Sequence, residues 1–254
     1  MKRLCLLALC TLLASASALA APPATHPLPS FVGLAIADKN RPEEDRALDA
    51  SRHPAAVLNF TGIKPGDVVV DWMPGKGYYT RLFSRMVGPK GKVIALQPAE
   101  MDKVAPKGLQ SVRGFAGTGE YANVTVLVQP VNDFKLPEPA DVIWTSMNYH
   151  DLHDPFMGPA DMPKLDKALF DALKPGGTLI VLDHAAADGT GTSKTNDLHR
   201  IDPAAVKAEL TAVGFTFDSE SDADRNPNDD HTKGIRDPSI KGNTDRFIYK
   251  FKKP

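Results

Sequence analysis

The chain of 254 residues carries 30 lysines and arginines against 31 aspartates and glutamates, which gives a formal net charge of −1. A chain so balanced, with no basic stripe or aromatic-rich basic patch, is not expected to bind nucleic acid. Hydrophobic residues make up 42% of the chain, enough for one large buried core.

The first 20 residues have the pattern of a secretory signal peptide. Lys2 and Arg3 precede an apolar run that ends at Leu13, and small residues follow up to Ala20. The run is shorter than the about 20 apolar residues that a spanning helix needs, and no later run is long enough. We therefore predict cleavage near Ala20, no membrane span afterwards, and a periplasmic or secreted protein. Both of the 2 cysteines precede this site, so no disulfide is expected.

The next segment, residues 21–42, is predicted to be an extended, proline-rich leader. The sequence from residue 43 to residue 60 has a helical pattern interrupted at Pro54, and Gly62 then ends the helix. Residues 43–254 are predicted to form a single domain, because no repeat or linker divides them.

Strands and helices alternate through this domain. The β-branched run Val68–Val70 is typical of a strand buried on both faces of a parallel sheet. The last two strands are separated only by a polar loop, residues 224–245, and should pair antiparallel. The prediction is an α/β fold with a doubly wound, seven-stranded, mostly parallel sheet and an antiparallel last strand. Strands are expected at residues 68–70, 92–96, 124–128, 141–147, 178–182, 215–217 and 247–251, with helices at 78–87, 162–173 and 204–213; residues 100–120 are weakly patterned.

A glycine-containing turn follows the first strand. In a doubly wound sheet, ligands bind at the carboxyl ends of the central strands, and this turn lies there. Gly75 and Gly77 allow the backbone to approach a ligand closely, and a helix that begins near Tyr78 points its amino terminus at the same place.

The order of these elements, with several local motifs, resembles the class I S-adenosylmethionine-dependent methyltransferases, a Rossmann-like fold. The resemblance extends from Arg46 to the last strand. Other motifs resemble a bacterial group of predicted, often periplasmic, methyltransferases. The motifs of the superfamily are residues 71–77, 134–137 and 173–177, and those of the bacterial group are residues 52–54, 148–151 and 199–202.

The resemblance implies that S-adenosylmethionine is the cofactor. Asp71, Gly75 and Gly77 would line its methionine end, with the ammonium group near Asp71. Gln97, at the end of the second strand, would contact the ribose. The last two implied contacts, Asn132 and Asp133 after the third strand, would lie near the adenine amino group.

The resemblance also implies methyl transfer to a small-molecule substrate, and it leaves the oligomeric state open. Asn148, His150 and Asp151 follow the fourth strand, where substrate and catalytic groups usually lie. A base is needed only if the acceptor must lose a proton, and His150, oriented by Asp151, could serve. A structural role for His150 in the loop after the strand is as well supported by the sequence as a catalytic role.

Two departures from the family pattern favour a different function. Met73 stands where the pattern has its first glycine, and the second strand ends without the usual acid for the ribose. These departures favour an exported, non-catalytic ligand-binding protein with the same fold. A metal-dependent hydrolase using His150 and His153, with His184, is a further alternative; the leading interpretation assigns no metal.

Overall fold

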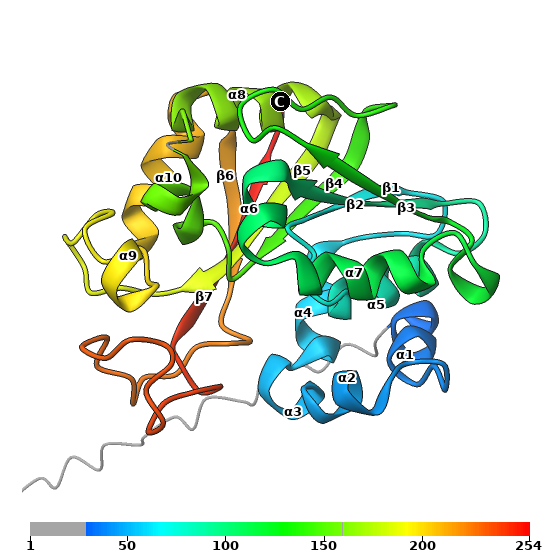
Figure 1. The fold of residues 1–254 in the computed structure, drawn as a ribbon, viewed down its shortest axis with the longest axis horizontal. Coiled ribbons are helices and arrows are strands. Elements are labelled where there is room, and N and C mark those ends of the chain that lie inside the picture. The colour runs from blue at the N-terminus through cyan, green and yellow to red at the C-terminus, as the bar shows by residue number, and fades with distance from the viewer. Residues whose placement is uncertain (1–28, 159) are drawn as a thin grey trace, which may run out of the picture.

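The computed structural model describes residues 29–158 and 160–254 (Figure 1). The predicted signal peptide and residues 21–28 of the leader lie outside the described residues. Among the helices of the described residues, none is both long enough and apolar enough to cross a bilayer.

A seven-stranded sheet forms the centre of the molecule, in the order β3-β2-β1-β4-β5-β7-β6. Strand β7 runs antiparallel to both of its neighbours, and the other pairs are parallel. The α/β fold, the doubly wound sheet and the antiparallel last strand are therefore confirmed. The strands are β1 (Val68–Trp72), β2 (Lys92–Pro98), β3 (Val124–Gln129), β4 (Ala140–Ser146), β5 (Leu173–His184), β6 (Thr216–Ser221) and β7 (Arg246–Lys252).

Helices cover both faces of the sheet (Figure 1). Helices α8 (Met162–Ala172) and α10 (Pro203–Ala212) pack on one face, while α1 (Ser30–Ile36), α4 (Pro54–Thr61), α5 (Tyr78–Val87) and α7 (Pro106–Phe115) pack on the other. The remaining helical segments are α2 (Glu43–Ala47), α3 (Asp49–Arg52), α6 (Ala99–Val104), α9 (Thr195–Leu198) and three 3₁₀ turns, η1 (Gly119–Tyr121), η2 (His150–His153) and η3 (Pro155–Met157).

The alternation of side chains along β1 decides which residue faces the site. Val68, Val70 and Trp72 point into the core beneath α8 and α10, whereas Val69 belongs to the core beneath α5. Asp71, one residue before Trp72, is therefore directed toward α5, where it meets the ligand end of the sheet.

One local prediction was wrong, and one weakly patterned segment forms helices that the sequence did not predict. The described part of the leader is not extended, because residues 30–36 form α1, whose Val32 and Ala35 are buried against α4 and α5. Residues 100–120 contain α6 and α7. In α7 only Leu109 and Val112 are buried, so the apolar stripe is too narrow to stand out in the sequence.

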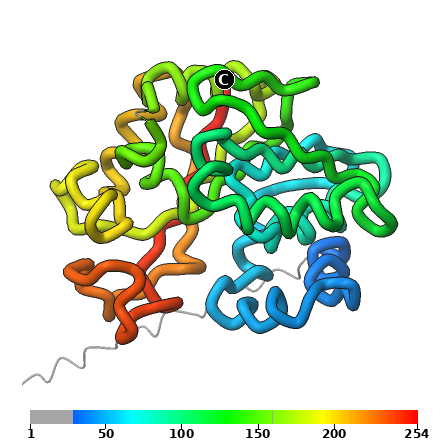
Figure 2. Tube along the Cα trace, in the orientation of Figure 1, coloured from blue at the N-terminus to red at the C-terminus, as the bar shows by residue number. Residues whose placement is uncertain are grey.

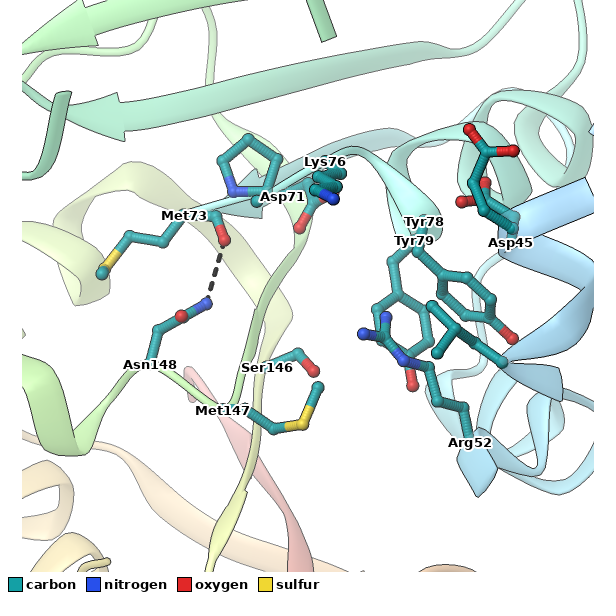
Figure 3. Close-up of a pocket in the computed structure, with 14 residues that line it drawn as sticks. Asp45, Arg52, Asp71, Met73, Lys76, Tyr78, Tyr79, Ser146, Met147 and Asn148 are labelled. Atoms are coloured by element: carbon teal, nitrogen blue, oxygen red, sulfur yellow. Dashed lines mark hydrogen bonds between the residues drawn. The ribbon is translucent and has the colours of Figure 1, made fainter. Parts of the chain in front are cut away.

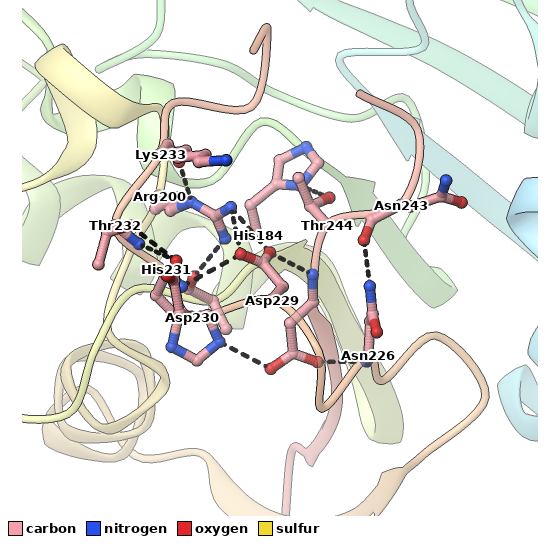
Figure 4. Close-up of polar contacts among 12 residues, drawn as sticks. His184, Arg200, Asn226, Asp229, Asp230, His231, Thr232, Lys233, Asn243 and Thr244 are labelled. Atoms are coloured by element: carbon pink, nitrogen blue, oxygen red, sulfur yellow. Dashed lines mark hydrogen bonds and ion pairs between the residues drawn. The ribbon is translucent and has the colours of Figure 1, made fainter. Parts of the chain in front are cut away.

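The polar loop between β6 and β7 is fixed to the rest of the protein (Figure 4). Arg200 donates to both carboxylate oxygens of Asp229, at 3.0 and 2.8 Å, and both side chains are buried. Asp229 also accepts from the backbone N–H of Asp245, at 2.7 Å. In Figure 2 this orange-red loop and the blue amino-terminal helices lie at the same end of the molecule, and the His53 Nδ1 to Asp224 Oδ1 contact of 2.8 Å joins them.

Candidate functional site

A pocket of about 410 Å³ opens at the carboxyl ends of β1 and β4 (Figure 3). Its walls come from three places: helices α2 and α3, the glycine turn with the start of α5, and the residues after β4. The lining residues are Glu44, Asp45, Leu48, Arg52, Asp71, Met73, Pro74, Gly75, Lys76, Tyr78, Tyr79, Ser146, Met147 and Asn148.

Two buried acids line this pocket: Asp45, which pairs with Arg81, and Asp71, with 2% of its surface exposed. The Asp71 Oδ2 accepts a hydrogen bond from the Thr80 hydroxyl at 2.5 Å, so α5 holds the carboxyl group in place. Burial raises the pKa of Asp71 to about 7, although the Thr80 hydrogen bond and the positive charge of Arg52 both oppose the shift. A cationic ligand group would therefore meet a carboxyl that ionises near neutral pH.

The glycine turn keeps its backbone shape despite the methionine. Met73, Gly75 and Gly77 all have left-handed φ angles, of 58°, 54° and 87°. Met73 thus adopts the conformation that a glycine would take, at a cost of about 1–2 kcal/mol. The Asn148 amide donates to the Met73 carbonyl at 2.9 Å and supports the turn. The departure from the family pattern is therefore one of side chain and not of backbone.

Arg52 is a pocket residue that the sequence reasoning missed. Its guanidinium lies over the ring of Tyr78, at 4.4 Å from the centroid, and 5.7 Å from that of Tyr79 (Figure 3). It is also the cation that acts on the Asp71 carboxyl. The motif of residues 52–54 was visible in the sequence, but only the packing of α3 beside the glycine turn shows that Arg52 faces the ligand end of the sheet.

The pocket brings together only some of the expected cofactor contacts. Asp71 and Gly75 line it, whereas Gly77 lies behind it as the residue before α5, where an added Cβ would meet Phe115 at 2.8 Å. Asn148, which was predicted as a catalytic residue, also lines the pocket. Two of the three residues expected at the methionine end thus line one cavity.

The residues expected at the adenosine end do not line this pocket. Gln97 is buried at the end of β2. Asn132 Oδ1 accepts from the backbone N–H of Asp161 at 2.8 Å, and Asp133 is exposed. Glu100, the nearest acid after β2, accepts from the Val131 N–H at 3.0 Å and so bridges the ends of β2 and β3. Cofactor contacts by Gln97, Asn132 and Asp133 stay predictions.

His150 is buried in η2 and does not line the pocket. Its Nδ1 lies 2.8 Å from Asp183 Oδ1, and its Nε2 lies 3.3 Å from Asp151 Oδ1. Burial alone would lower the pKa of His150, but the two aspartates outweigh it and raise the pKa to about 10. A general base must be unprotonated, so these contacts support a structural role, and catalysis by His150 and Asp151 stays a prediction.

The three histidines considered for a metal site do not converge. His153 Nε2 lies 3.3 Å from Glu209, and His184 Nδ1 lies 2.7 Å from the Thr244 hydroxyl. The ring centroid of His150 lies 6.0 Å from that of His184 and 5.5 Å from that of His199. Among the described residues, the group that brings its ligand atoms within 4.8 Å of one another is His150, Asp151 and His199.

Comparison with known proteins shows that the chain is similar to methyltransferases. No protein-family model matches the chain. The chain is 29% identical over 166 residues to a ubiquinone/menaquinone biosynthesis C-methyltransferase, UbiE, of Teredinibacter turnerae, with 65% of the chain and 60% of the relative covered. The enzyme of that name from Cronobacter sakazakii is 33% identical over 130 residues, covering 50% of the chain and 46% of the relative. The chain thus spans about half of the length of these relatives.

Solved structures agree on the fold. A SAM-dependent methyltransferase from Aquifex aeolicus superposes with a TM-score of 0.54 at 24% identity, covering 85% of this chain and 100% of the other. An S-adenosylmethionine-dependent methyltransferase from Mesorhizobium loti gives a TM-score of 0.56 at 16% identity, covering 81% and 99%. The protein therefore has the fold of the class I S-adenosylmethionine-dependent methyltransferases and is similar in sequence to the UbiE enzymes.

Proposed function

We propose that the protein is a class I methyltransferase that uses S-adenosylmethionine and acts on a small molecule. One observation carries the proposal: Asp71 and Arg52, of opposite charge, share a pocket with the glycine turn at the start of α5. An amino-acid group carries one ammonium and one carboxylate, and these two side chains match them. Asp71 would bind the ammonium, and Arg52 with the amino terminus of α5 would bind the carboxylate.

For methyl transfer, the main task of the protein is to position the two reactants. The cofactor supplies a sulfonium methyl group, which passes to a nucleophile as the carbon–sulfur bond breaks. The pocket residues would hold the two reactants in line and exclude water. Tyr78, Tyr79 and Met147 provide apolar wall for this purpose, and Asn148 fixes the turn through the Met73 carbonyl.

The relatives support a small-molecule acceptor. The enzymes from Teredinibacter turnerae and Cronobacter sakazakii are named as C-methyltransferases of ubiquinone and menaquinone biosynthesis. Because the chain spans only 60% and 46% of those two proteins, we extend from them only the class of acceptor and not the quinone itself.

One observation favours a second function, a binding protein without methyl chemistry. The pocket is not lined by the residues expected to bind adenosine, Gln97, Asn132 and Asp133. Its lining therefore suits an amino-acid group and includes none of the expected adenosine contacts. Such a protein would bind a small zwitterion and would have no use for the nucleoside.

Calorimetric titration with S-adenosylmethionine, S-adenosylhomocysteine and free methionine separates the two functions. The methyltransferase proposal expects micromolar binding of the first two and much weaker binding of methionine. Asp71→Asn should abolish that binding, whereas Asp67→Asn, just before the other end of β1, should not. Binding of methionine alone would favour the second function, and no binding of any of the three would contradict both.

We further propose that residues 1–20 direct export, as their pattern predicts. Expression of the full chain in a Gram-negative host, followed by fractionation and amino-terminal sequencing, tests this. The expected product is periplasmic and begins at residue 21 or 22. A cytoplasmic product that keeps residues 1–20 would contradict the proposal.

A further inference from the structure

A second group of functional side chains lies after β4, outside the pocket described above. Its members are His150 and Asp151 of η2 and His199, the residue that ends α9. Asp151 Oδ1 lies 3.3 Å from His150 Nε2 and 3.6 Å from His199 Nδ1, and the three atoms all lie within 4.8 Å of one another. Ligands of one tetrahedral metal ion at about 2.1 Å stand about 3.4 Å apart, so these spacings fit.

The ring of His150 is oriented as a metal ligand requires. Asp183 accepts from the His150 backbone N–H and from its Nδ1, both at 2.8 Å. The Nδ1 contact fixes the ring and leaves Nε2 directed at Asp151. A carboxylate behind the ligating histidine is the usual support in protein metal sites, because it sets the tautomer and makes the ligand more basic.

A second, independent feature points to a cation here. Asp154 has 1% of its surface exposed, and neither of its carboxylate oxygens accepts a hydrogen bond from the residues that the structure describes. The Thr195 hydroxyl lies beside it but donates to the Thr192 carbonyl at 3.1 Å. Asp154 lies beside the group, because its backbone N–H donates to the Asp151 carbonyl at 3.1 Å. A buried carboxyl without a partner is costly, and a bound cation would offset that cost.

The third ligand is held in a strained conformation. His199 has a φ of 53°, in the left-handed region that non-glycine residues seldom adopt. Its side chain is 23% exposed and that of Asp151 is 15% exposed, so one side of the group reaches solvent. A metal ion could enter from this side and would keep a coordination position open for water or a ligand.

We propose that His150, Asp151 and His199 bind one divalent transition-metal ion of the Zn²⁺ type, with Asp154 as an outer carboxylate. Two imidazoles and one carboxylate suit Zn²⁺, Fe²⁺ or Co²⁺, whereas Mg²⁺ and Ca²⁺ prefer oxygen ligands alone. The site is distinct from the pocket that contains Asp71, and its existence does not depend on methyl transfer.

The test is titration of the chelator-treated full chain, prepared without a histidine tag, with Zn²⁺ by calorimetry and with Co²⁺ by visible absorption. The expected result is one ion per chain, a rise in melting temperature, and the d–d bands of a nitrogen- and oxygen-bound Co²⁺. His199→Asn should weaken binding more than about a hundredfold, since losing even a supporting residue costs about 10–100-fold. Asp154→Asn should weaken it less.

His231→Asn is the matched control. His231 also has a left-handed φ, of 61°, its side chain is also 23% exposed, and it also pairs with an aspartate, Asp245, at 3.0 Å. The His231→Asn variant should bind Zn²⁺ with the same affinity as the natural chain. Absence of binding to the natural chain, or equal effects of the two histidine changes, would overturn the proposal. Circular dichroism confirms that each variant is folded.

Discussion

Asp71 gives the proposed cofactor site a dependence on pH. With a pKa of about 7, only about one-tenth of the carboxyl is ionised at pH 6, and most of it is ionised above pH 7.5. An ammonium ligand needs the ionised form. We expect the affinity for S-adenosylhomocysteine to rise several-fold between pH 6 and pH 7.5. Calorimetry across this range, with Asp71→Asn showing no such rise, checks it.

The same carboxyl affects the stability of the ligand-free protein in the opposite direction. The pKa is raised on folding, so the stabilising contribution is complete below about pH 4 and is lost as the pH rises through about 7. Asp71→Asn should therefore show a flatter fall in the free energy of unfolding between pH 4 and pH 7, measured by urea denaturation. A pH profile identical to that of the natural chain would contradict the assigned shift.

Arg52 should matter for binding through its charge. Arg52→Met keeps a long apolar side chain over Tyr78 but removes the cation, and losing one charged hydrogen bond costs about 1.5–3 kcal/mol. We expect S-adenosylhomocysteine to bind about 10–100-fold more weakly, measured by calorimetry. Arg113→Met, which removes an exposed arginine paired with Asp102, is the control and should leave the affinity unchanged.

At the level of elements, the contact between α5 and α7 depends on a single glycine. Alanine at Gly77 would place its Cβ 2.8 Å from the Phe115 ring and would also strain a φ of 87°. Gly75, with a φ of 54°, has open space around its missing Cβ. Gly75→Ala should cost about 1 kcal/mol of stability and Gly77→Ala about 2–4 kcal/mol, by urea denaturation. Equal losses would contradict the close approach of the two helices.

The elements that the sequence predicted well have strong local signals. The β-branched run at residue 68 predicted β1. The helix predicted at residues 204–213 is α10, whose start is fixed by the Asp202 carboxylate, which accepts from the Ala204 N–H at 2.9 Å. Helices α1 and α7 were missed because tertiary contacts stabilise them more than their own sequences do. Each buries only two of its residues.

The candidate site was predictable only where one segment supplies it. Asp71 and Gly75 belong to a local turn, and Asn148 ends a strand, so all three could be placed at the ligand edge. Arg52 belongs to α3, and no sequence pattern predicts that α3 packs beside the glycine turn. The approach of His199 to Asp151 depends on how α9 packs against η2, which spacing along the chain does not encode.

At the level of the whole molecule, the buried Arg200–Asp229 ion pair stabilises the loop between β6 and β7. Asp229→Asn would leave the Arg200 guanidinium buried without its counter-charge, at a cost of about 3–5 kcal/mol. We expect that loss in urea denaturation and faster proteolytic cleavage within residues 224–245. Asp230→Asn, a change at the exposed neighbour, should alter stability by less than about 0.5 kcal/mol. Equal behaviour of the two variants would show that the pair does not hold the loop.

The position of β7 determines when the sheet can be completed during folding. Although it is the last strand in the sequence, it lies inside the sheet, between β5 and β6. When the chain emerges from the ribosome or from a membrane channel, one edge of β5 and the edges of β6 stay unpaired until residues 246–252 are available to pair with both strands. Until β7 has been synthesised, a nascent chain of this topology exposes the unpaired edges of β5 and β6 to chaperones, and a stop codon before residue 246 would leave β6 without its partner in the sheet.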